Sequence, residues 1–200
     1  MTHAMNTLPA AAPRRLLHTR QVTTDGFLRD DGLWDLDGEL RDTKTYTSGS
    51  SGGTVRQPGE PIHHMRVRLT LDDEMLVHAA VAVMVNTPFE ECQPAALPLG
   101  GLVGARIGLG WRHSVNQAMG GVAGCTHIRE LLMAMATVAF QTIGPYRRQE
   151  KMRKGETARH YPGDRPAHQM GQCMAWDFKG AVIARVAPQF IDWKPKKIDG

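Results

Sequence analysis

The feature that most constrains the fold of this chain is a run of alternating apolar and polar side chains between residues 64 and 71. The apolar members share one face of a β-strand and the basic members share the other, so one face is buried and one is wet. An acidic turn follows, and residues 75–85 are then apolar at nearly every position, as expected of a strand covered on both faces. Together these segments predict an antiparallel β-hairpin, with Met65, Val67, Leu69 and Leu71 on its buried face.

Strand, turn and helix patterns in the rest of the chain place this hairpin in an α+β fold. Alternation over residues 14–22 and 34–41 predicts two earlier strands, joined by a turn at residues 29–32. Short helices are expected near residues 95–105 and 111–119, and residues 171–186 read as a second hairpin turning at Lys179-Gly180. Strands followed by helices and a closing hairpin favour antiparallel sheet packed on helices over a parallel βαβ array.

The clearest helical pattern covers residues 127–143, where apolar residues recur at the spacing of one buried helical face. Thr126 is the expected N-cap and Gly144-Pro145 the expected stop. Cys125 and His127 therefore flank a helix start, where unpaired N–H groups and the helix dipole favour a thiolate, a neutral imidazole or a bound anion. The alternatives are a small buried hydrophobe for Cys125 and a capping or solvated histidine for His127.

The composition of the 200 residues indicates one domain, residues 14–200, behind a flexible tail at residues 1–13. Ser/Gly-rich residues 45–60 are expected to form a mobile loop, and residues 147–168 a solvated basic arm. The net charge is +4, but no nucleic-acid-binding motif accompanies it. Without a membrane-spanning run or a signal peptide, and with three widely spaced cysteines, we expect a reduced cytoplasmic protein with no membrane or nucleic-acid partner.

Further candidate groups lie near the predicted strands. His63 shares the parity of the buried face of its strand, where a hydrogen-bonded structural histidine and a catalytic one are both consistent with the pattern. Asp31 is either a turn residue or a carboxylate that reaches a pocket, while Lys44 and Tyr46 flank the loop and could bind a phenolate. A thiolate–imidazole metal site is a separate alternative, but no close cysteine pair supports it; its ligands would be Cys92, Cys125, His127 and Cys173.

Several motifs resemble, in order, a bacterial domain-of-unknown-function family, number 2889 in that series. The motifs cover nearly the whole chain. One departure is His64, where the family pattern usually has an acidic residue. The matching residues are Arg15, His18-Thr19-Arg20, residues 29–35, Asp42-Thr43-Lys44, Gly59-Glu60-Pro61-Ile62-His63, Met65, Leu102-Val103-Gly104, Ile107-Gly108, residues 124–127, Gln141 and Cys173.

This resemblance implies a function, because some similar proteins are thought to act as γ-formaldehyde lyases on lignin-derived aromatic dimers. They remove a hydroxymethyl group from a phenylcoumaran or diarylpropane to give a stilbene, without a cofactor. In this chain His127 or His63 would be the base and Asp31 would orient a histidine. The phenolate would be held by Lys44, Tyr46 or Arg29, with Cys125 beside the substrate. The alternative is a metal- or iron–sulfur-binding accessory protein that uses the three cysteines and His127; a homodimer is the default assembly.

Overall fold

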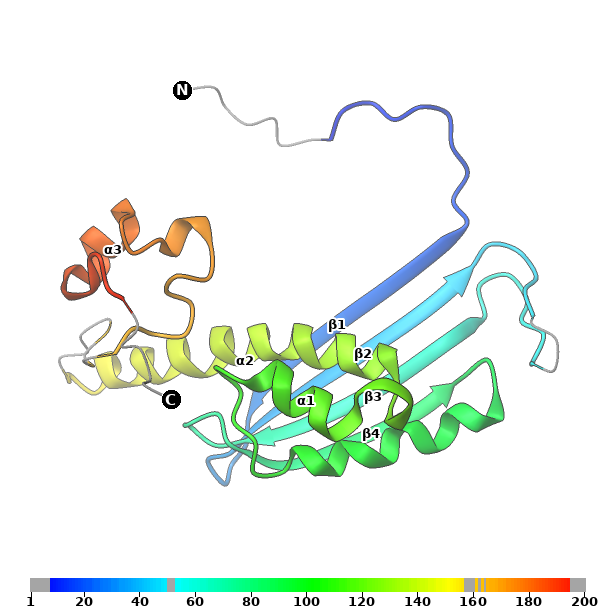
Figure 1. The fold of residues 1–200 in the computed structure, drawn as a ribbon, viewed down its shortest axis with the longest axis horizontal. Coiled ribbons are helices and arrows are strands. Elements are labelled where there is room, and N and C mark those ends of the chain that lie inside the picture. Colours follow the sequence, from blue (N-terminus) through cyan, green and yellow to red (C-terminus); the bar gives the residue numbers. More distant parts are fainter. Residues whose placement is uncertain (1–7, 50–52, 157–160, 162, 164, 195–200) are drawn as a thin grey trace.

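The computed structural model describes residues 8–49, 53–156, 161, 163 and 165–194, and it has the expected α+β architecture (Figure 1). Four strands come first and helices follow. The strands are β1 (His18–Leu28), β2 (Trp34–Lys44), β3 (Pro61–Leu71) and β4 (Val77–Asn86). The helices are η1 (Glu90–Leu102), α1 (Trp111–Met119), η2 (Gly121–Ala123), α2 (Thr126–Arg153), η3 (Met174–Trp176), α3 (Ala181–Val186) and η4 (Pro188–Phe190).

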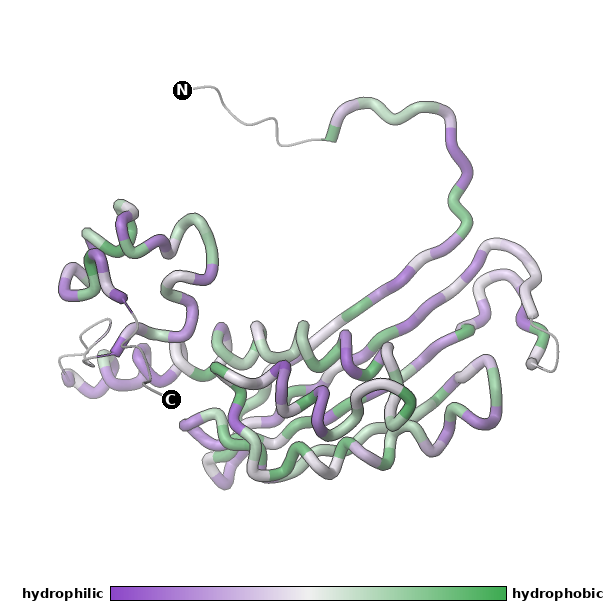
Figure 2. The backbone as a smooth tube through the Cα atoms, viewed as in Figure 1, coloured by the Kyte–Doolittle hydropathy of each residue, from purple (hydrophilic) through white to green (hydrophobic). Residues whose placement is uncertain are grey.

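The strands form one antiparallel sheet in the order β1-β2-β3-β4, which confirms the predicted β3–β4 hairpin. The register places Leu40 of β2 opposite Met65 of β3, and Asp42 opposite His63. Because side chains alternate along a strand, these residues share one face of the sheet with the other buried side chains of β2 and β3. Figure 2 shows the corresponding alternation of hydrophobic and hydrophilic positions along the strands.

The helices cover this apolar face, with α2 lying across β1 and β2, η1 beside β4, and α1 packed against η1 and α2 (Figure 1). Two strand glycines let α2 approach closely. A Cβ atom at Gly38 would lie 2.6 Å from the sulfur of Met135, and one at Gly26 would lie 2.5 Å from the hydroxyl oxygen of Thr142. The helix therefore touches the sheet at two points that no larger residue would permit without a shift.

The expectation that the fourth strand is covered on both faces is wrong. Val81, Val83 and Val85 on its outer face are 58%, 53% and 45% exposed. The reason is that β4 is an edge strand and the helices pack on only one face of the sheet. On the outer face of the neighbouring strand, His64 bonds to Glu39 with Nε2 and Oε1 2.5 Å apart, which agrees with its assignment to the wet face.

Helix α2 does not stop at Gly144-Pro145, as the sequence predicted, but continues to Arg153. Proline removes one helical hydrogen bond at a cost of about 3 kcal/mol, and contacts of the next turn oppose that loss. The Tyr146 ring meets Trp34 edge-on with centroids 5.6 Å apart, and Arg147 Nε lies 3.1 Å from a carboxylate oxygen of Asp73. The first part of the expected basic arm, residues 147–153, is consequently helical.

Two further expectations need correction. The N-cap of α2 is Cys125 rather than Thr126, and its side chain makes no capping bond. Residues 171–186 contain η3 and α3 instead of a hairpin, because their apolar residues gather into a separate small cluster around Ile183 and Phe190. Residues 1–7 of the expected tail, 50–52 of the expected loop, and 157–160, 162 and 164 of the expected arm lie outside the described residues. None of the described helices is both long and apolar enough to cross a membrane.

Candidate functional site

One acidic side chain, Asp42, collects polar partners from three other elements. It lies two residues before the end of β2, on the face that packs against the helices, and its side chain is only 1% exposed. A buried carboxylate is costly unless it is paired and hydrogen-bonded. The partners of Asp42 therefore define the site.

The first partner is Arg20 of β1, which the register places directly opposite Asp42. Its guanidinium donates two hydrogen bonds, from Nε to Oδ1 and from Nη2 to Oδ2, both at 2.8 Å. The remaining Nη1 donates to a carboxylate oxygen of Glu130 on α2 at 2.6 Å. Arg20 thus fixes the plane of the carboxylate and links the sheet to α2, since a bidentate pair defines direction as well as charge.

Three histidines complete the cluster. His18 Nε2 lies 3.3 Å from Oδ1 of Asp42, and His63 Nδ1 lies 3.0 Å from Oδ2. His127 Nε2 lies 3.7 Å from the same Oδ2, and its ring is tilted by 31° against the His63 ring with centroids 3.9 Å apart. We call these five residues the Asp42 cluster: His18, Arg20, Asp42, His63 and His127.

The fold brings these residues together from three strands and the start of α2. In adjacent antiparallel strands, residues in register on the same face lie side by side, and this holds for Arg20, Asp42 and His63. His127 is the second residue of α2, and its Nδ1 lies 3.7 Å from the sulfur of Cys125 just before the helix. Its Nε2 is consequently the nitrogen that faces the carboxylate.

The balance of burial and neighbouring charges lowers the pKa values of three groups in the cluster, which favours the ionised form of the carboxyl group and the neutral form of the imidazoles of His63 and His127. Burial opposes ionisation of Asp42, but hydrogen bonds from Arg20 and His18 outweigh it and lower its pKa to about 2. Burial lowers the pKa of His63, against the attraction of Asp42. Burial also lowers the pKa of His127, helped by the nearby His63 and Arg20. At neutral pH the site therefore holds an ionised carboxylate beside two imidazoles, of His63 and His127, that favour the neutral form.

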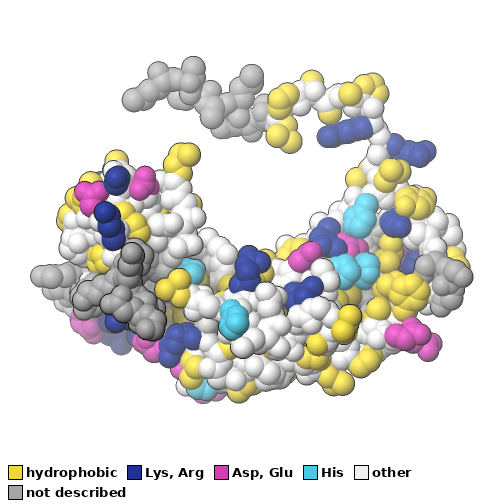
Figure 3. Space-filling model, viewed as in Figure 1, with side chains coloured by type: hydrophobic (Ala, Val, Ile, Leu, Met, Phe, Trp, Pro, Cys, Tyr) yellow, Lys and Arg dark blue, Asp and Glu magenta, His cyan; other side chains and the backbone are white. Residues whose placement is uncertain are grey.

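The imidazoles remain accessible although the carboxylate is not. The side chains of His18, His63 and His127 are 48%, 22% and 23% exposed. Figure 3 shows histidine side chains beside acidic and basic ones on the hollowed face of the molecule. The accessible imidazoles of His63 and His127, which favour the neutral form and are oriented by a carboxylate, can accept a proton or bind a metal ion.

The structure brings His63 and His127, both expected from the sequence, into one site, but it does not bring Asp31 to them. Asp31 and Arg29 pair with each other at the β1–β2 turn, with two atoms 2.6 Å apart. That turn is at the other end of β2, about 27 Å from Asp42 at the rise of a strand. The carboxylate that orients the histidines is Asp42 instead.

Lys44 and Tyr46 lie at the same end of β2 as the cluster. Lys44 is opposite His18 in the register, and its ammonium lies 5.2 Å from the centre of the Tyr46 ring. The four proposed metal ligands do not converge: within the described part of the chain, the group of three or more donors that meet within 4.8 Å is Asp42, His63 and His127. Cys92 and Cys173 are not part of it.

Sequence reasoning missed Asp42, Arg20 and His18 as site residues. A signal for Asp42 was present: it continues the buried parity of Trp34, Leu36 and Leu40, one residue beyond the predicted end of the strand. A carboxylate at a buried-face position demands a partner. Arg20 could be found only from the register, because nothing in the sequence states which residue of β1 lies opposite Asp42.

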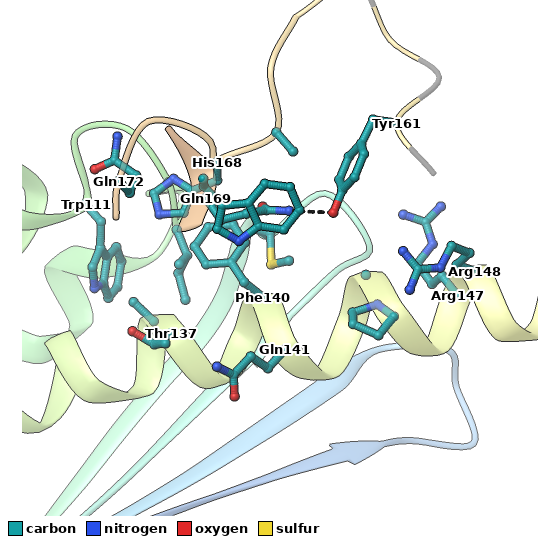
Figure 4. A pocket seen from close by; sticks show the side chains of 18 of the residues that line it. Trp111, Thr137, Phe140, Gln141, Arg147, Arg148, Tyr161, His168, Gln169 and Gln172 are labelled. Atoms are coloured by element: carbon teal, nitrogen blue, oxygen red, sulfur yellow. Dashed lines mark hydrogen bonds between the residues drawn. The ribbon is translucent and has the colours of Figure 1, made fainter. Parts of the chain in front are cut away.

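A second feature is a cavity of about 1350 Å³ between α2 and the C-terminal segments (Figure 4). Trp111, Phe140 and Trp176 give it aromatic walls, and Arg147 and Arg148 add charge at one end. The ring of His168 stacks on Phe140 with centroids 3.9 Å apart, and Gln169 donates to the hydroxyl of Tyr161 at 3.0 Å. The cluster and the cavity occupy different stretches of α2, since no residue of the cluster lines the cavity.

Comparison with known proteins connects the cluster to a family. The family described as "Protein of unknown function (DUF2889)" matches residues 18–141. All five residues of the Asp42 cluster lie within this span, whereas much of the cavity lining lies beyond it. No curated protein and no solved structure matches the chain significantly. The match covers well over half of the chain, so the protein belongs to the DUF2889 family.

Proposed function

We propose that the protein is a carbon–carbon lyase that releases formaldehyde from the γ-hydroxymethyl group of a lignin-derived aromatic dimer, with the Asp42 cluster as its acid–base site. The observation that carries this proposal is the placement of two neutral, accessible imidazoles, His63 and His127, against one buried carboxylate. The resemblance described above supplies the reaction. The family-matched span contains every residue of the cluster.

The proposed reaction needs a base and a place for a phenolate. In a phenylcoumaran whose para-hydroxyl group has lost its proton, opening of the Cα–O bond expels one phenolate and converts the other ring into a quinone methide. The base then removes the proton of the γ-hydroxyl, the Cβ–Cγ bond breaks and formaldehyde leaves. The electron pair of that bond forms the Cα=Cβ double bond of the stilbene, and the ring electrons of the quinone methide restore a phenolate. The substrate itself is the electron acceptor, so the step requires no oxidant or cofactor.

Residues of the cluster have distinct roles in this proposal. His127 or His63 is the base, because a neutral imidazole within reach of substrate is the group that general-base catalysis requires. Asp42 is a positioning residue that orients the two imidazoles and stabilises the imidazolium that forms. Lys44 and Tyr46, at the same end of β2, supply a cation and an aromatic face for a phenolate ring.

The test is formaldehyde release, together with the absorbance of a stilbene, from a phenylcoumaran or a diarylpropane and chelator-stripped protein. His63→Ala and His127→Ala are each expected to reduce kcat by about 10²- to 10⁴-fold, the usual contribution of general-base catalysis. His78→Ala is the matched control, because His78 also faces a carboxylate, Asp72 at 3.0 Å, but lies outside the cluster. Absence of formaldehyde with both substrates would refute the proposed function. Full activity of the His63→Ala/His127→Ala double variant would refute the assignment of the base.

A further inference from the structure

The three groups that meet at Oδ2 of Asp42 are also a set of metal ligands. Two histidines and one carboxylate are the donor set of many zinc and non-haem iron sites, which leave further coordination positions open. Within the described residues, these are the three His, Cys, Asp or Glu side chains whose donor atoms come within 4.8 Å of one another. Their geometry can be compared with the requirements of a single ion.

The separations between donor atoms need little adjustment. Two ligands each about 2.1 Å from one ion, at angles between 90° and 109°, lie about 3.0 to 3.4 Å apart. The Nδ1 of His63 is 3.0 Å from Oδ2 of Asp42, and Nε2 of His127 is 3.7 Å from the same oxygen. A shift of a few tenths of an ångström would bring each nitrogen to the expected separation from the oxygen, and the two nitrogens lie within 4.8 Å of each other.

The surroundings of the three ligands have the form of an outer shell. Ligating carboxylates are usually hydrogen-bonded themselves, and Arg20 holds Asp42 through both oxygens. Arg20 adds a positive charge, but it also pairs with Glu130, so two carboxylates face one guanidinium. A carboxylate has about four lone-pair sites; Arg20 occupies two of them and His18 a third, which leaves one at Oδ2 for an ion. The local balance remains favourable to a cation.

The orientation of His127 and the charge state of both imidazoles also agree with this use. Cys125 lies beside Nδ1 of His127 at 3.7 Å, so Nε2 is the nitrogen directed at Oδ2. Burial lowers the pKa of His63 and of His127, and a neutral imidazole is the form that binds metal. Imidazole donors select zinc, iron, cobalt, nickel or copper over magnesium or calcium, which prefer oxygen ligands.

We propose that Asp42, His63 and His127 bind one divalent transition-metal ion of the zinc class. The ion would occupy the lone pairs of both candidate bases. A regulatory consequence follows that rests on the proposed function: Zn²⁺ and proton abstraction exclude one another, and Zn²⁺ inhibits the lyase.

The test uses the full-length chain stripped with chelator and titrated with Zn²⁺ by calorimetry and with Co²⁺ by visible absorption. The wild type is expected to bind one ion per chain, while Mg²⁺ gives no signal. His63→Ala and His127→Ala are each expected to weaken Zn²⁺ binding by about 100-fold or more. Loss of a residue that only supports a ligand already weakens metal binding by about 10- to 100-fold, so loss of a ligand itself should cost at least as much. The control His78→Ala should bind as the wild type does. His63→Asn and His127→Gln replace any alanine variant whose circular dichroism shows that it has not folded.

The outcomes separate the site from the reaction. Equal Zn²⁺ binding by the wild type and both cluster variants, or no stoichiometric binding at all, overturns the metal site and leaves the lyase proposal standing. Binding that depends on His63 and His127 supports the site even in a protein that releases no formaldehyde, a result that would sink the proposed function alone. A protein that binds Zn²⁺ through the cluster and keeps its full lyase activity would overturn the regulatory consequence.

Discussion

Replacing Asp42 by asparagine tests how strongly the cluster contributes to the fold. The pKa of Asp42 falls from its ordinary value of 3.8 to about 2 in the folded protein. Each pKa unit corresponds to about 1.4 kcal/mol, so the ionised carboxylate stabilises the native state by roughly 2 kcal/mol at neutral pH. Loss of one member of a buried pair usually costs 3–5 kcal/mol. We therefore expect Asp42→Asn to lower the free energy of unfolding by between about 2 and 4 kcal/mol.

The sign of the pH dependence follows from the same pKa. A group whose pKa is lowered on folding contributes its full stabilisation above its unfolded value, here 3.8, and loses it as the pH falls toward the folded value. The contribution of the Asp42 carboxylate to the difference between wild type and Asp42→Asn should therefore be complete at pH 7 and should shrink from about pH 4 to pH 2. Other carboxylates that titrate in this range affect both proteins equally.

Urea unfolding followed by circular dichroism, in buffer with chelator, measures this difference. Asp25→Asn on β1 is the control, because Asp25 is exposed and outside the cluster, and its replacement should change stability by less than about 0.5 kcal/mol. The reasoning fails if Asp42→Asn matches the wild type within about 0.5 kcal/mol. It fails equally if the loss of stability is the same at pH 3 as at pH 7.

Three further substitutions probe the framework of the site. Gly38→Ala places a Cβ atom 2.6 Å from the sulfur of Met135 and should lower the free energy of unfolding by about 1–3 kcal/mol. The same substitution should cost less in a Met135→Ala background, where the sulfur is absent. Equal melting temperatures for wild type and Gly38→Ala would contradict this. Pro145→Ala restores a helical hydrogen bond and should raise the midpoint of urea unfolding by an amount equivalent to about 1–3 kcal/mol. An unchanged midpoint would show that the proline does not destabilise α2. Trp34→Phe removes the 3.0 Å hydrogen bond from the indole to Asp73 and should lower the free energy of unfolding by about 2–3 kcal/mol in the same assay. Unchanged stability would exclude a contribution from that hydrogen bond.

Local patterns were sufficient to predict the central hairpin, a helix from about residue 127 onward, and the placement of two histidines of the candidate site. The parity of His63 and the position of His127 at a helix start follow from periods of two and 3.6 residues, which are properties of the chain alone. The continuation of α2 through Pro145 could not be predicted in this way, because contacts with Trp34 and Asp73, more than seventy positions earlier, oppose the proline.

The candidate site shows the same division. Which histidines face inward is a local property, but which carboxylate they meet depends on strand register and on the placement of α2. A turn and a neighbouring basic residue favour Asp31 in the sequence, whereas the carboxylate that meets the histidines is Asp42, whose parity matches the buried face. Register is set by the whole sheet, since a slip of one residue would turn Asp42 to the opposite face.

The two close approaches between α2 and the sheet have a mechanical consequence. Met135 rests on Gly38 and Thr142 on Gly26, so the middle of α2 lies directly on the sheet, while side-chain contacts hold the helix near both of its ends. His127 lies about 12 Å along the helix before the first of these approaches, and Lys151 of the cavity wall lies about 14 Å beyond the second. The two glycines, which belong neither to the cluster nor to the cavity lining, thereby set how near α2, and with it His127, lies to the strands that carry Asp42 and His63.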